Sequence, residues 1–216
     1  MRAGDHPRLL LVEGATERRL LPELLEANGV VWSKDEVPVY IEPMGGFDKF
    51  WRDGVIRTHL KAARREAVGL IFDADQLEDR RWKTAVSKCR SFAELPALPP
   101  AEGWIGASTA EGPRFGVWMM PDNQSRGYLE TFLHFLVRDS DDPLYQHAKN
   151  AVQGALERNA AFDPIRGRDK AEIHTLLAWQ QEPGKQLHDA IKHRVLHPES
   201  DLAAPFVTWF RTLFEL

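Results

Sequence analysis

Two aspartates separated by a single residue follow a short apolar run in the chain. The stretch is Val68-Gly69-Leu70-Ile71-Phe72-Asp73-Ala74-Asp75. An apolar run of this length, bounded by charged residues, predicts a strand that is buried on both faces of a parallel sheet. Side chains at positions i and i+2 of a strand point the same way, so we expect Asp73 and Asp75 to converge at the carboxyl end of the strand.

Paired carboxylates at such a place favour a metal ion. Open α/β sheets bind their ligands at the carboxyl ends of the strands. Two carboxylates held together repel each other unless a cation or a shared proton lies between them. Mg²⁺ is the favoured ion, with Mn²⁺ as the alternative, because Mg²⁺ accepts one or two carboxylates and keeps several of its waters. The competing interpretation is that both aspartates only cap the helix expected to begin near Leu77.

Three further acids stand where a strand ends or a helix begins. Glu13 follows the first apolar run of the chain, Asp122 follows the last such run before residue 139, and Glu130 lies in the first turn of the helix expected next. Because the carboxyl ends of parallel strands meet at one edge of a sheet, we expect Glu13 to lie beside Asp73.

Strands and helices alternate over the first 139 residues. Strands are expected at 8–12, 37–41, 68–72, 104–107 and 114–120, and helices at 16–27, 47–65, 77–92 and 127–137. This alternation is typical of a right-handed, mostly parallel α/β layer. The rest of the chain has helical patterns at 144–160, 170–181, 186–195 and 204–214. We therefore predict an α/β core over residues 1–139, with helices flanking a central sheet, and a helical extension over residues 140–216 packed on it.

Composition narrows the class of protein. The chain has 216 residues, enough for one sizeable core, and a formal net charge of -4. This charge argues against a protein that coats nucleic acid non-specifically, but it allows an enzyme that meets phosphates locally. The single cysteine, Cys89, excludes an internal disulfide and fits a reducing compartment. With no apolar run of membrane-spanning length and no signal-peptide pattern, we expect a cytoplasmic protein without membrane contact.

Two of these stretches together resemble the Toprim domain of topoisomerases, bacterial primases, recombination proteins and OLD-family nucleases. The family pattern is a glutamate-glycine after the first strand and an Asp-x-Asp after the third. Here Leu11-Val12-Glu13-Gly14 and Ile71-Phe72-Asp73-Ala74-Asp75 match it, about 60 residues apart. Residues 116–130 and 170–180 are similar to a small group of free-standing, Toprim-like prokaryotic proteins related to the OLD nucleases.

The resemblance implies Mg²⁺-dependent phosphodiester chemistry on DNA or RNA. By position, Asp73 and Asp75 become metal ligands, and Glu13 becomes a ligand or a general base.

The nuclease branch of the family implies further residues. There, additional acids complete a second metal site and a lysine assists at the phosphate. Glu130 is the first choice for the extra acid, Asp122 the second, and Lys170 is the candidate lysine.

The chain also departs from the larger Toprim proteins. It lacks the tyrosine-bearing domain of a topoisomerase, the zinc-binding part of a primase and the ATP-binding loop of an OLD protein. The resemblance therefore implies a free-standing unit, or one that works with a separate ATPase partner, for which host defence is a fitting role. Two functions remain open: a metal-dependent nuclease, and a regulatory module that holds a metal, nucleotide or partner without turnover.

Basic residues have two open interpretations. A cluster follows the Asp-x-Asp stretch and consists of Arg80, Arg81, Lys83, Lys88 and Arg90. It is either a solvated helix face or a guide for phosphates. Arg166 and Arg168 have the same two interpretations. His188-Asp189 resembles part of a metal-dependent HD phosphohydrolase site, but two adjacent residues arise easily by chance.

Overall fold

A five-stranded, mostly parallel sheet forms the centre of the protein. The computed structural model describes residues 5–33, 37–52, 54–76, 78–108 and 112–216. The strands are β1 (Arg8–Val12), β2 (Tyr40–Pro43), β3 (Ala67–Asp73), β4 (Trp104–Ala107) and β5 (Arg114–Met120), in the order β2-β1-β3-β5-β4. Neighbouring strands are parallel except β4, which runs antiparallel to β5 at one edge. The predicted fold class, an α/β protein with a mostly parallel sheet, flanking helices and further C-terminal helices, is confirmed.

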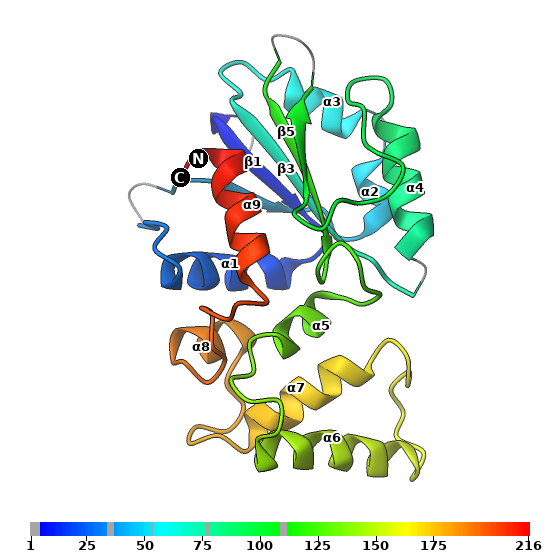
Figure 1. The fold of residues 1–216 in the computed structure, drawn as a ribbon, viewed down its shortest axis with the longest axis vertical. Coiled ribbons are helices and arrows are strands. Elements are labelled where there is room, and N and C mark those ends of the chain that lie inside the picture. The colour runs from blue at the N-terminus through cyan, green and yellow to red at the C-terminus, as the bar shows by residue number, and fades with distance from the viewer. Residues whose placement is uncertain (1–4, 34–36, 53, 77, 109–111) are drawn as a thin grey trace.

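Helices cover both faces of this sheet. They are α1 (Ala15–Ala27), α2 (Phe47–Phe50), α3 (Val55–Leu60), α4 (Glu78–Cys89), α5 (Leu129–His134), α6 (Pro143–Leu156), α7 (Arg168–Ala178), α8 (Leu187–Lys192) and α9 (Ala204–Phe214). Helices α2, α3 and α4 lie on one face, and α1 and α9 lie on the other (Figure 1). Helices α5, α6 and α7 lie beyond the carboxyl ends of the strands.

The alternation of β3 divides the core into two layers. Val68, Leu70 and Phe72 pack with α2, α3 and α4, whereas Ile71 packs with α1 and α9 on the opposite face. Because side chains alternate along a strand, Asp73 leaves the sheet on the same face as Ile71.

The last helix belongs to the core of the sheet. Helix α9 approaches β3 and β5 closely because both strands carry a glycine there. A Cβ atom on Gly69 would lie 3.0 Å from Leu213 Cδ2, and one on Gly116 would lie 2.7 Å from the same atom. The predicted extension therefore contains two kinds of helix: α6 and α7 pack on each other beyond the strand ends, while α9 covers the sheet itself.

Several element boundaries differ from the prediction, including those of the second strand and of the helix expected after it. The second strand is Tyr40–Pro43 rather than 37–41, and the single helix expected at 47–65 is two short ones, α2 and α3. Gly54 precedes α3 with a left-handed φ of 73°, a conformation that interrupts a helix and that glycine adopts at little cost.

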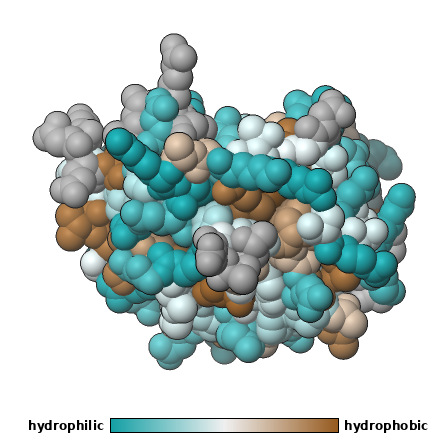
Figure 2. All heavy atoms as spheres, turned by 90° about the horizontal axis from the view of Figure 1, so that it is seen from above, coloured by the Kyte–Doolittle hydropathy of each residue, from teal (hydrophilic) through white to brown (hydrophobic). Residues whose placement is uncertain are grey.

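Of the helices in the described residues, none is both long and apolar enough to cross a membrane. Figure 2 shows the end of the molecule that is uppermost in Figure 1, where hydrophilic residues cover most of the surface and hydrophobic ones form small separate areas.

Candidate functional site

The order of the strands in the sheet indicates where a ligand would bind. From β1, the sheet extends to β2 on one side and to β3 on the other, so the strand order reverses between β1 and β3. Open α/β sheets bind ligands at this switch point, outside the carboxyl ends of the two strands. Glu13 directly follows β1, and Asp73 is the last residue of β3.

Glu13 and Asp73 meet at this point. Oε2 of Glu13 accepts the backbone N–H of Asp73 at 3.2 Å and an N–H of Arg81 at 2.6 Å. By alternation from Leu11, which packs on the face of α4, Glu13 points toward that helix. This direction explains why its partner is Arg81 of α4.

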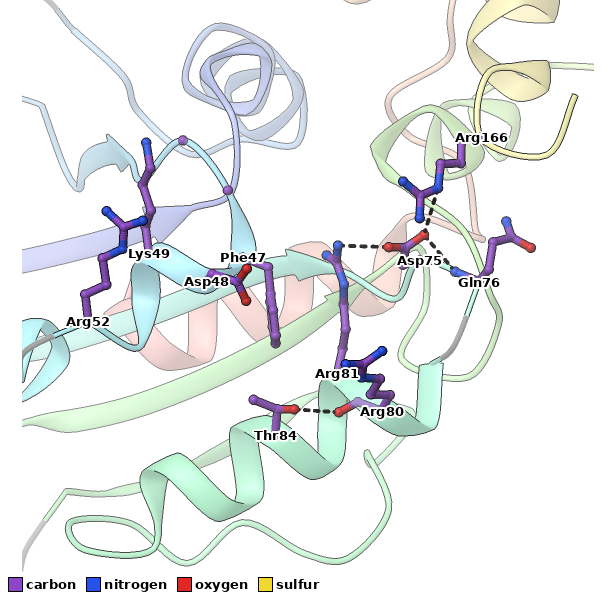
Figure 3. A pocket seen from close by; sticks show the side chains of 12 residues that line it. Phe47, Asp48, Lys49, Arg52, Asp75, Gln76, Arg80, Arg81, Thr84 and Arg166 are labelled. Carbon is purple, nitrogen blue, oxygen red and sulfur yellow. Dashed lines mark hydrogen bonds and ion pairs between the residues drawn. The ribbon is translucent and has the colours of Figure 1, made fainter. Parts of the chain in front are cut away.

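Arg81 connects three residues of the site. Its Nη1 also donates to the carbonyl oxygen of Asp73 at 3.0 Å, and its Nη2 donates to Oδ2 of Asp75 at 3.0 Å. The guanidinium lies over the ring of Phe47, 4.7 Å from its centre. Arg81 is thus a counter-charge, supplied by the protein, between Glu13 and Asp75. Figure 3 shows its contact with Asp75.

Asp73 is buried near three other carboxylates. Its Oδ1 accepts the backbone N–H of Leu129, the first residue of α5, at 3.0 Å. Burial raises the pKa of Asp73 well above its usual value, and the nearby carboxylates of Glu13, Glu17 and Glu130 raise it further. The charge of Arg81 acts in the opposite direction without cancelling these effects. Asp73 therefore holds its proton more tightly than a solvent-exposed aspartic acid does.

Asp75 does not continue the strand. Its φ of 61° is left-handed, and its backbone pairs with Gly127 through two hydrogen bonds of 2.9 and 3.1 Å. The predicted geometry, with Asp73 and Asp75 pointing the same way at positions i and i+2 of one strand, is wrong because the strand ends at Asp73. Glu13 and Asp75 instead meet at the two nitrogens of Arg81.

Hydrogen bonds stabilise the charged form of Asp75. Burial acts to raise the pKa of this carboxyl group, but the Tyr128 hydroxyl, which donates to Oδ1 at 2.8 Å, and the N–H of Gln76 lower it. Together with the charges of Arg81 and Arg166, they hold the pKa of Asp75 below its usual value. Asp75 is therefore ionised at neutral pH.

A basic pocket opens beside Asp75. The pocket has a volume of about 530 Å³ and lies between the turn after β2 and the start of α4. Of the described residues that line it, the basic ones are Lys49, Arg52, Arg80, Arg81 and Arg166, and the acidic ones are Asp48 and Asp75. Figure 3 shows Lys49 and Arg52 on the side of the pocket away from Asp75 and Arg166. An anionic group that entered this pocket would meet an excess of positive charge next to an ionised carboxylate.

Glu130 lies on the other side of Asp73. Its side chain is 14% exposed, and Oε1 lies 2.9 Å from Nζ of Lys170. Its charge contributes to the raised pKa values of both Asp73 and Glu17. Two residues predicted from the sequence, Glu130 and Lys170, therefore form an ion pair next to the acids at the strand ends.

Asp122, the second choice for the extra acid, lies in the turn after β5. Its carboxylate accepts the N–H groups of Gln124 and Ser125 and the hydroxyl of Ser125, at 3.0, 2.6 and 2.9 Å. These bonds close the turn after β5. We therefore take Asp122 to be a turn residue and do not include it in the site.

Comparison with known proteins places the chain in a family. The family model described as "Protein of unknown function (DUF3226)" matches residues 7–215. The chain belongs to the DUF3226 family. Neither the curated proteins nor the solved structures gave a match. The DUF3226 match includes the strand ends, the basic pocket and all the C-terminal helices. The resemblance to Toprim proteins stays a prediction.

Sequence reasoning missed two residues of this DUF3226 site. Glu17 is buried and accepts the N–H of Gly14 at 3.1 Å, and its pKa is raised by burial and by Glu13 and Glu130. Its signal was the spacing of a capping box, with a glycine in place of the usual serine or threonine. Tyr128 gave no signal, because only the folded loop brings its hydroxyl to Asp75. We call the five acids at the strand ends (Glu13, Glu17, Asp73, Asp75 and Glu130) the edge cluster.

Proposed function

We propose that the protein is a Mg²⁺-dependent enzyme that cleaves phosphodiester bonds of DNA or RNA at the edge cluster. The observation that carries the proposal is that Glu13, Asp73 and Asp75 gather at the switch point of the sheet, where Glu13 binds the backbone N–H of Asp73 and Arg81 joins Glu13 to Asp75, beside a pocket lined by five basic residues. Phosphodiester substrates are polyanions, and a basic pocket next to carboxylates suits a reaction in which both a metal ion and a phosphate must be bound.

The chemistry of the donors fits a hard divalent ion. The edge cluster offers carboxylate oxygens, which Mg²⁺ and Mn²⁺ prefer. Burial raises the pKa of Asp73 and neighbouring acids raise it further, and an added cation would oppose both effects. Such an ion, when bound, supplies Lewis-acid activation of water and stabilises the leaving oxygen.

Arg81 sets a condition on this proposal. Its guanidinium occupies the space between Glu13 and Asp75, where it donates to both. An ion that bound both carboxylates would replace these two contacts, so the Arg81 side chain would have to turn toward the basic pocket that it already lines. There it would join Arg80 and Arg166 in binding phosphate oxygens, for which the planar guanidinium is well suited.

The remaining residues have roles that follow from their places. Lys49 and Arg52 would bind the nucleic-acid backbone at the far side of the pocket. Glu13 would position the attacking water as a general base, because it is the acid next to both Asp73 and Arg81. Glu130 and Lys170 would support Asp73 from the side of α5 and α7.

One observation favours a second candidate function. The edge cluster already has an internal counter-charge, because Arg81 pairs with Glu13 and Asp75 at 2.6 and 3.0 Å. A site of this kind is stable without a metal, as expected for a regulatory module that binds a nucleotide phosphate in the basic pocket without turnover. A separate ATPase partner and a role in defence are parts of this proposal that depend on the Toprim resemblance alone.

The decisive experiment measures cleavage with matched variants. Purified protein is incubated with Mg²⁺ or Mn²⁺ and with labelled single- and double-stranded DNA and RNA. Asp75→Asn nearly preserves shape and removes one metal-binding charge, so cleavage should fall by more than about 100-fold, the upper range for losing an outer-shell partner of a metal. The control is Glu66→Gln, at the amino end of β3, where Glu66 pairs with Arg8 at 3.4 Å.

Three outcomes separate the candidates. Metal-dependent cleavage by wild type and Glu66→Gln, with loss in Asp75→Asn, supports the enzyme. Nucleotide or nucleic-acid binding without cleavage, weakened by Arg166→Ala, supports the regulatory module. Equal cleavage by wild type and Asp75→Asn would refute a catalytic edge cluster.

A further inference from the structure

A second group of possible metal ligands lies on the helices beyond the sheet. His134 ends α5, and Asp169 and Glu172 lie on one face of α7. One ligand atom from each of these residues lies within 4.8 Å of the other two. We call these three residues the helix cluster. It lies apart from the basic pocket, whose lining includes none of the three.

His134 is oriented with one ring nitrogen toward the acids. Its Nδ1 is hydrogen-bonded to the hydroxyl of Tyr145 on α6 at 2.6 Å. Its Nε2 is buried, has no hydrogen-bond partner among the described residues, and lies 3.9 Å from Oε2 of Glu172. A buried ring nitrogen without a partner is costly, because the group has lost water and gained nothing in its place.

Glu172 is also buried without a close partner for its charge. Its side chain is only 8% exposed. Its two oxygens face Arg168 and His134 at 3.9 Å each, distances longer than a hydrogen bond. Asp169 is held more firmly, because its Oδ2 accepts the hydroxyl hydrogen of Thr131 at 2.5 Å. Two acids and an imidazole nitrogen therefore surround a point at which the protein supplies no compensating group within hydrogen-bond distance of both His134 Nε2 and Glu172.

We propose that His134, Asp169 and Glu172 bind a divalent transition-metal ion, with Zn²⁺ as the best fit, that fastens α5 to α7. The donors are one imidazole nitrogen and two carboxylate oxygens, a set that Zn²⁺ accepts and that the all-oxygen preference of Mg²⁺ does not favour. In the tautomer in which Nδ1 donates to the Tyr145 oxygen, Nε2 presents its lone pair to the ion. The hydrogen bond to Tyr145 is the kind of outer contact that fixes metal-binding histidines.

The geometry needs only a small adjustment. Ligand atoms around a tetrahedral Zn²⁺ are about 3.3 Å apart, as follows from bond lengths of about 2.0 Å. The 3.9 Å between His134 Nε2 and Glu172 Oε2 would have to shorten by less than about 1 Å, and none of the separations among the three ligand atoms, all within 4.8 Å, by more than about 1.5 Å. The fourth position would be left to water.

The position of the ion gives it a structural role. Helix α5 begins with Leu129, whose N–H binds Asp73, and ends with His134. An ion at the helix cluster would fix the end of α5 opposite to the edge cluster and hold α7 against it. This inference does not depend on the proposed nuclease function.

The test uses Zn²⁺ and Co²⁺ with the purified full chain. After treatment with a chelator, wild type should bind one Zn²⁺ per chain in calorimetry, and an excess of Mg²⁺ should not displace it. Zn²⁺ should also raise the melting temperature, since a ligand that binds only the folded state stabilises it. Co²⁺ in the same site should give the strong visible absorption of an ion with fewer than six ligands.

Variants locate the site. His134→Gln and Glu172→Gln should each lower Zn²⁺ affinity by at least about 100-fold, and Tyr145→Phe by about 10- to 100-fold. His147→Gln is the control, because His147 is an exposed histidine of α6 that stacks on Trp179. Circular dichroism of each metal-free variant shows whether it is folded.

Two results would overturn the proposal. One is the absence of tight Zn²⁺ and Co²⁺ binding by wild type, which needs no variant to interpret. The other is a Co²⁺ spectrum that survives in His134→Gln but disappears in Asp75→Asn, because the ion would then occupy the edge cluster.

Discussion

The edge cluster and the helix cluster gather acids in two different ways. At the edge cluster, Glu13, Asp73 and Asp75 all accept hydrogen bonds from the protein, and Arg81 reaches two of these carboxylates within 3.0 Å. At the helix cluster, Glu172 faces the guanidinium of Arg168, whose Nε is 3.9 Å away on a side chain that is 42% exposed. Glu13 and Asp75 are thus compensated by Arg81, whereas Glu172 is compensated only weakly.

This difference indicates that the helix cluster depends more on an added cation for its stability than the edge cluster does. A buried carboxylate costs several kcal/mol unless it is paired and hydrogen-bonded. The protein meets this cost at the edge cluster through Arg81, so a metal ion there must compete with an arginine. No such competitor lies within hydrogen-bond distance of Glu172, so an ion at the helix cluster gains the whole compensation.

The largest effect on stability should come from removing the internal counter-charge. Arg81→Met keeps the apolar stem of the side chain, which is 18% exposed, and leaves Glu13 and Asp75 without their cation. We expect a loss of about 3 kcal/mol in the free energy of unfolding, measured with urea at pH 7. The matched change, Arg168→Met, should cost less than about 1 kcal/mol, because its ion pair is longer and more exposed.

A divalent ion should reverse part of the first effect. If the edge cluster binds Mg²⁺, the ion should stabilise Arg81→Met more than wild type, since the arginine no longer competes. Equal effects of Arg81→Met and Arg168→Met on stability would show that the two clusters do not differ as proposed.

Four of the five acids of the edge cluster, all except Glu17, were visible in the sequence because each follows a predicted strand or lies in the first turn of a predicted helix. An apolar run identifies a strand, alternation of strands and helices implies a parallel sheet, and a parallel sheet places strand ends on one edge. Glu13 and Asp73 were found on this reasoning. The sequence did not show the left-handed turn at Asp75, because that turn depends on the pairing of Asp75 with Gly127.

The helix cluster could not be predicted from the sequence, for a different reason. Asp169 and Glu172 share a helix face, but His134 comes from another helix, and no short motif connects the three. Their meeting depends on how α5 packs against α7, which is tertiary structure. The place of α9 was hidden in the same way: its apolar residues predict a buried helix, but not that Gly69 and Gly116 admit it to the sheet.

The pH dependence of stability should be of the same sign at both clusters but larger at the edge. Burial and neighbouring acids raise the pKa of Asp73 well above its usual value, and burial and Asp169 raise that of Glu172. An acid whose pKa is raised by folding binds its proton more tightly in the folded state. Its contribution to stability is therefore complete below about pH 4, its unfolded pKa, and is lost as the pH rises through the folded pKa.

Substitution removes this pH dependence. Asp73→Asn should become progressively more stable relative to wild type as the pH increases from about 4 to 8, in urea unfolding at each pH. Glu172→Gln should show the same trend with a smaller slope. A difference from wild type that stays constant with pH for Asp73→Asn would mean that Arg81 compensates the whole edge cluster, Asp73 included.

The smallest effects should come from two tyrosines, one at each cluster. The Tyr128 hydroxyl donates to Asp75 at 2.8 Å, and the Tyr145 hydroxyl binds Nδ1 of His134 at 2.6 Å. In Tyr128→Phe, Asp75 keeps Arg81 and the N–H of Gln76 and gains access to water from the pocket, so we expect a loss of about 0.5 kcal/mol.

Tyr145→Phe should cost more, about 1 to 2 kcal/mol in the metal-free protein, because Tyr145 is 7% exposed and its loss leaves Nδ1 of a histidine unpaired beside the already unpaired Nε2. Urea unfolding at pH 7 compares the two variants directly. The order of the two stability losses tests the difference between the clusters. Other donors replace the hydrogen bond that Asp75 loses in Tyr128→Phe, whereas we expect no donor to replace the one that His134 loses in Tyr145→Phe. A larger loss of stability in Tyr128→Phe than in Tyr145→Phe would mean that water or another donor binds the ring nitrogens of His134. That result would count against a metal ion at the helix cluster.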